Sequence, residues 1–116
     1  MAISNSTIDT TNKVVYQSIG DNAITTIIIC NKEPFRPAEP LYGQTNLYLY
    51  AVPAVEVSGT TTQDKHTLIN GLPIPAGETV TLDQEKIVLS TGDAIIAKSE
   101  LNSPANLVLT ISTLAV

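Results

Sequence analysis

Short runs of β-branched and alternating residues, each ended by turn residues, constrain the fold of this chain more than any other feature. Residues 23–30 are rich in Ile and Thr, which favour extended backbone. No stretch carries apolar residues at helical spacing over three turns. Turn signals recur about every 8–12 residues, as in sandwiches and barrels. The pattern therefore predicts an all-β fold: a single antiparallel β-sandwich of about seven to nine short strands, immunoglobulin-like or jelly-roll-like in its connections.

The strands themselves can be placed from this alternation. We expect them at residues 14–19, 23–30, 45–52, 66–69, 78–82, 86–89, 94–97 and 106–114, with residues 55–57 extending or restarting the third. The turn residues 20–22 and 90–93 predict two hairpins, and Asn70-Gly71 predicts a turn after the strand at 66–69.

The length of 116 residues suits one domain. The N-terminal segment differs in composition from the rest of the chain. Residues 1–12 are rich in Ser, Thr and Asn and contain few large apolar side chains. We expect a flexible N-terminal arm over residues 1–12, followed by the β-sandwich domain over 13–116. Ile3 and Ile8 would be the arm's anchors on a neighbouring chain, so the arm would be dispensable for folding but needed for assembly.

Charge and composition argue against several classes of function. Eleven acidic and six basic residues give a net charge of −5, which disfavours nucleic acid as a partner. Apolar runs are too short to span a membrane, and the N-terminus does not have the pattern of a signal peptide. Cys30 and His66 are the chain's single thiol and imidazole. We expect Cys30 to be buried and His66 to lie at a solvated strand edge. The sequence therefore predicts no enzyme, no metal site and no cofactor.

The segment from Lys32 to Gly43 is a candidate contact element. Prolines at positions 34, 37 and 40 forbid a central strand and pre-order the backbone, which lowers the entropy cost of docking. Its candidate interface residues are Phe35, Leu41 and Tyr42 as apolar anchors and Arg36 as a planar donor to a carboxylate. The alternative is a loop that folds back over one end of its own sandwich.

Tyr48 and Tyr50 are further candidate interface residues. They alternate with Leu47 and Leu49 on one strand, so one pair faces the core and the other faces away. If the leucines are buried, the tyrosines form an outward aromatic surface of the kind found in interfaces. The sequence leaves both orientations open.

Several motifs resemble those of a small β-sandwich found among structural proteins of tailed-phage virions. The resemblance covers about nine-tenths of the chain and rests on Ile27–Asn31, Leu47–Tyr50, Leu72–Thr79, Ile87–Leu89, Gly92–Ala97 and the alternation at 107–116. The chain differs in its segment after Asn31, which is long and proline-rich where a short polar loop would be expected.

This resemblance implies a non-enzymatic virion protein made in the host cytoplasm. A capsid decoration (cement) protein is the first expectation, and a neck, tail or fibre component is the alternative. Its partners would be the major capsid protein or neck and tail proteins, and the chain would form a homo-oligomer, preferably a trimer. A carbohydrate- or ligand-binding β-sandwich module is the competing interpretation, although the chain has no Trp for sugar stacking.

Overall fold

A computed structural model describes residues 2–8, 10–39, 42–57, 66–82, 87–100 and 107–116. The described residues form nine strands and one short 3-10 helix, η1. Their bounds are β1 (Ala2–Ile8), β2 (Lys13–Gln17), β3 (Asn22–Asn31), β4 (Thr45–Val52), η1 (Ala54–Glu56), β5 (Thr67–Ile74), β6 (Thr79–Leu82), β7 (Ile87–Leu89), β8 (Ala94–Ser99) and β9 (Leu107–Ala115).

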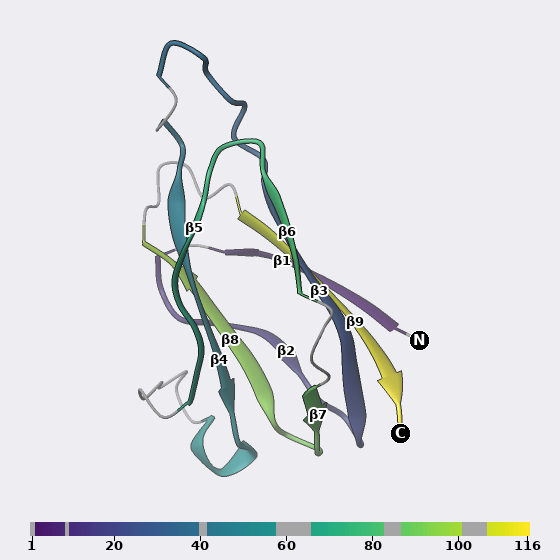
Figure 1. Ribbon diagram of the computed structural model, residues 1–116. Helices are drawn as coiled ribbons and strands as arrows, with labels where there is room; N and C mark the ends of the chain where they lie inside the picture. Colours follow the sequence, from purple (N-terminus) through teal and green to yellow (C-terminus); the bar gives the residue numbers. More distant parts are fainter. Residues whose placement is uncertain (1, 9, 40–41, 58–65, 83–86, 101–106) are drawn as a thin grey trace.

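Two antiparallel sheets pack face to face, which confirms the predicted β-sandwich (Figure 1). The five-stranded sheet has the order β1-β9-β3-β6, with β7 also paired to β3, and the four-stranded sheet has the order β2-β8-β4-β5. β6 and β7 pair with successive parts of β3, so they occupy one position in the sheet. Counted in this way, each sheet has four positions, and the strand order is that of a jelly roll rather than an immunoglobulin domain.

The core lies between the sheets and follows the period of two along each strand. On β9, Leu107, Leu109 and Ile111 are buried, and Leu47 and Leu49 of β4 oppose them from the other sheet. Full burial of one such side chain contributes roughly 1.5–3 kcal/mol. Alternation thus divides the side chains of a strand between two faces, and on β9 the apolar set is the one that faces the core.

Both predicted hairpins are wrong, although the strands that flank them are present. β2 pairs with β8 and β3 pairs with β9, so residues 18–21 cross from one sheet to the other. Likewise β7 pairs with β3, whereas β8 belongs to the other sheet. The two crossing turns bind each other: Ser18 N donates to Asp93 O and Gly92 N donates to Ser18 O, both at 2.8 Å. Turn residues fix a reversal of direction but do not fix which strands pair.

Residues 2–8, expected within a flexible arm, instead form β1. This strand pairs antiparallel with β9 over its whole length, from Ala2 opposite Thr113 to Ile8 opposite Leu107. Ile8 is fully buried in the core, and the Ser6 hydroxyl donates to the Val15 carbonyl of the opposite sheet. Hydrogen bonds to β9 and this one apolar anchor order a segment whose own composition is poor in apolar residues.

Two local predictions in the β4–β5 region are also corrected. Asn70-Gly71 does not end a strand, because β5 runs from Thr67 to Ile74 through a register shift that leaves Gly71 without a partner. Gly71 has a φ of 81°, so the expected turn is a β-bulge, a place where glycine is favoured. Residues 55–57, expected to extend or restart the strand at 45–52, instead belong to η1 (Ala54–Glu56) and its C-cap Val57.

Candidate functional site

Among the described residues, the connection between β3 and β4 is the main projection from the sandwich. It extends beyond the end of the sandwich, where it is the uppermost loop in Figure 1. Residues 34–39 are all exposed, so the described part of this loop does not fold back over its own sheets. We call residues 32–43 the projecting loop. Pro40 and the predicted anchor Leu41 lie outside the described residues.

Asn31, the last residue of β3, fixes the base of the projecting loop. Its side chain is 1% exposed. Its Nδ2 donates to the carbonyl oxygens of Gly43 at 2.9 Å and Ile74 at 3.0 Å, and its Oδ1 accepts from Glu33 N at 3.0 Å. One amide therefore joins both ends of the loop to β5. No sequence pattern indicated this role, because the partners lie 2, 12 and 43 positions away.

Gly43 closes the loop in a conformation that requires glycine. Its φ is 80°, and a Cβ at this position would clash with Cγ of Glu33. Glu33 itself is buried at the loop base. The two ends of the loop are thus packed tightly against each other, which limits how far the loop can swing.

The outer part of the projecting loop presents an aromatic and cationic surface. The Arg36 guanidinium stacks on the Tyr42 ring at 3.9 Å from its centroid. Two backbone hydrogen bonds hold this part together, with Glu39 N donating to Arg36 O and Tyr42 N donating to Glu39 O, both at 2.9 Å. Phe35 is 54% exposed and Tyr42 is 38% exposed. The loop therefore offers a partner two aromatic side chains and a positive charge held in place by stacking.

The remaining predicted interface residues do not join this surface. Leu47 and Leu49 face the core, so Tyr48 and Tyr50 face the outside of the four-stranded sheet. Tyr50 is nevertheless only 9% exposed, because it packs with Val52 and Ile96 in a second apolar cluster.

Tyr48 packs at the margin of that cluster, with the Lys98 ammonium 5.1 Å from its ring centroid. On β1, Ile3 is 65% exposed, whereas Ile8 is buried within its own chain and cannot anchor a neighbour. The seven candidates within the described residues thus divide between the projecting loop, the outer faces of the two sheets and the core.

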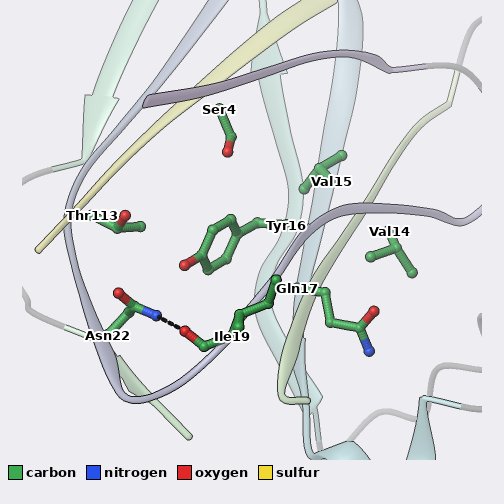
Figure 2. Close-up of a pocket in the computed structure, with 8 residues that line it drawn as sticks. All are labelled: Ser4, Val14, Val15, Tyr16, Gln17, Ile19, Asn22 and Thr113. Atoms are coloured by element: carbon green, nitrogen blue, oxygen red, sulfur yellow. Dashed lines mark hydrogen bonds between the residues drawn. The ribbon is translucent and has the colours of Figure 1, made fainter. Parts of the chain in front are cut away.

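A shallow groove of about 500 Å³ lies between the edge strands β1 and β2. Figure 2 shows the Tyr16 ring in its middle, with the hydroxyls of Ser4 and Thr113 nearby. The Asn22 side chain donates to the Ile19 carbonyl at 2.9 Å on the rim. The lining is uncharged and carries hydroxyl groups, which suits binding of a small neutral molecule better than acid–base chemistry.

Residues with catalytic potential are not gathered at either place. His66 is buried, at 8% exposure, where a solvated edge position was expected. Cys30 is half-buried on the outer side of β3 rather than in the core. Among the described residues, no three His, Cys, Asp or Glu side chains are grouped to hold a metal ion, and no helix is long and apolar enough to cross a membrane.

Comparisons with family models, with curated proteins and with solved structures gave no match to this chain. The resemblance to phage virion sandwiches therefore rests on the sequence motifs.

Proposed function

We propose that this chain is a non-enzymatic structural protein of a tailed-phage virion that decorates the capsid and attaches through the projecting loop. The observation that carries the proposal is the loop itself, which is anchored at its base by Asn31 and exposes Phe35, Arg36 and Tyr42 beyond the sandwich. A pre-ordered loop with aromatic anchors loses little conformational entropy on docking. The motif resemblance supplies the virion context, and a neck, tail or fibre position is the alternative within it.

The jelly-roll architecture is compatible with this role but does not decide it. Jelly rolls occur in viral capsid domains and also in lectins, and a fold hosts many functions. Assembly therefore depends on the surface rather than on the fold. A homo-oligomer or an array on the capsid would multiply a weak loop contact, since linked sites bind far more tightly than single ones.

The test is co-sedimentation of the protein with capsids that lack it. Phe35→Ser and Tyr42→Ser are expected to weaken binding at least tenfold, because each removes an exposed aromatic anchor. Their melting temperatures should stay within a few degrees of the parent value, since exposed substitutions change stability little. Ile19→Ser is the matched control: it is 89% exposed in the turn at the opposite end of β3 and should leave binding unchanged.

Two outcomes would overturn the proposal. Unchanged binding by both loop variants would show that the loop is not the contact. A large drop in melting temperature would show that Phe35 and Tyr42 stabilise their own domain. Cryo-electron microscopy of the intact particle would then place the protein in the head, neck, tail or fibre.

The groove between β1 and β2 favours a second candidate, a module that binds a small neutral ligand such as a sugar. Tyr16 provides an aromatic surface, and Ser4 and Thr113 provide hydroxyl groups. Titration with neutral mono- and disaccharides, followed by NMR, should then shift signals of β1 and β2 residues. Tyr16→Ala should abolish those shifts. Shifts that survive Tyr16→Ala, or no shifts at all, would exclude this candidate.

A further inference from the structure

The outer face of the five-stranded sheet is a second exposed surface with the composition of a binding surface. It consists of the odd-numbered residues of β1, the even-numbered residues of β9 and their neighbours across β3, β6 and β7. One row across the sheet is Asn5, Thr110, Ile28 and Thr81. The Thr110 hydroxyl donates to Asn5 Oδ1 at 2.8 Å, so the side chains of these two residues point to the same side of the sheet.

None of the described residues of this outer face is acidic or basic. On an ordinary soluble surface about a quarter to a third of positions are charged. Three of its aliphatic side chains are well exposed: Ile3 at 65%, Val88 at 64% and Leu114 at 48%. Charged residues border the face in the connections before β3 and β6, at Asp21 and Glu78. An uncharged centre with charged borders is the composition of a protein–protein interface.

We propose that this outer face binds the same face of a second copy of the chain. The chain carries a net charge of −5, so two copies approach most easily through a surface without charge. Its Thr and Ser hydroxyls both donate and accept hydrogen bonds, which makes the face complementary to itself. Antiparallel sheets also pack readily face to face, with their strands nearly aligned. A face that carries no charge offers nothing specific to a strongly acidic or basic partner.

The area of the face places this contact among small, weak interfaces. Four strands about 4.8 Å apart, with rows of side chains about 6.8 Å apart, span roughly 19 by 27 Å, or about 500 Å² per copy. About 1,000 Å² in total is at the lower limit for a specific interface, so the dissociation constant should be on the order of 100 µM. A contact between identical faces closes at two copies, unlike the trimer preferred from the sequence.

Sedimentation equilibrium from roughly 10 µM to roughly 1 mM brackets that dissociation constant. The protein should pass from monomer to dimer over this range. Ile28→Lys, near the centre of the face, should raise the dissociation constant at least tenfold, because each copy would then bring a charge into the contact. Thr81→Lys makes the same test at an exposed position of β6, where folding is not at risk.

Asn70→Lys is the matched control, since it adds the same charge to exposed β5 of the other sheet and should leave the dimer unchanged. A monomer at 1 mM, a monomer–trimer equilibrium, or a dimer that Asn70→Lys weakens more than Thr81→Lys would overturn the proposal. Phe35→Ser should also leave the dimer unchanged, because the projecting loop lies outside this face. Failure of the capsid contact and failure of the dimer are thus distinguishable.

Discussion

Replacement of Asn31 should be among the most damaging single substitutions in this protein. The side chain is 1% exposed and makes three hydrogen bonds to backbone groups. Asn31→Ala leaves the Ile74 carbonyl and the Glu33 N–H buried without this partner, while the Gly43 carbonyl is half-buried and can reach water. Each buried group left unpaired costs about 1–3 kcal/mol. We therefore expect a loss of about 3–4 kcal/mol in the free energy of unfolding.

Urea denaturation followed by circular dichroism measures this loss. The loss expected for Asn31→Ala would remove a large part of the roughly 5–15 kcal/mol that stabilises a domain. Asn5→Ala is the matched control, because Asn5 is an exposed residue of the same sheet with one side-chain hydrogen bond. This variant should lose no more than about 0.5 kcal/mol of its free energy of unfolding.

The variant Asn31→Asp separates hydrogen bonding from shape. Aspartate has nearly the same shape as asparagine and can still accept from Glu33 N, but it presents a carboxylate oxygen to the carbonyls of Gly43 and Ile74. It should be at least as destabilising as Asn31→Ala, because a buried charge then faces two acceptors. A loss below about 1 kcal/mol for either variant would refute the reasoning, since water would then be replacing the amide.

Two further predictions test the edges and turns of the sandwich by the same urea assay. Ile8→Ala should cost about 2–4 kcal/mol because Ile8 is fully buried. Ile3→Ala should cost less than about 0.5 kcal/mol because Ile3 is 65% exposed. A small loss for Ile8→Ala would contradict the packing of β1 and favour a flexible arm instead. Gly20→Ala should cost about 1–2 kcal/mol from its φ of 77°, as nothing lies within 4 Å of the new Cβ. Gly92→Ala should cost about 1 kcal/mol more, because its Cβ would lie 2.8 Å from that of Ala54. Equal losses at the two glycines would contradict the packing of η1 on the 90–93 turn.

The sequence by itself indicated eight of the nine strands of the described residues, all but β1, and for most of these their bounds to within a few residues. Alternation along residues 106–114 also assigned Leu107, Leu109 and Ile111 to one face, and all three are buried. These properties are local, because the direction of a side chain in a strand depends only on its position along that strand. The same period left Leu47 and Tyr48 equivalent until the opposing sheet showed which side is the core.

Only the tertiary structure decided which strands pair and what anchors the projecting loop. Residues 20–22 and 90–93 reverse the chain, but each joins strands of different sheets, since pairing depends on partners far away in the sequence. β1 is ordered by β9 from the other end of the chain. Asn31 has an unremarkable position at the end of an apolar run, and its role follows from carbonyl groups that only folding brings beside it. Hydrogen bonds between distant segments leave no periodic signal, and for that reason the sequence could suggest this loop as a contact but not its anchor.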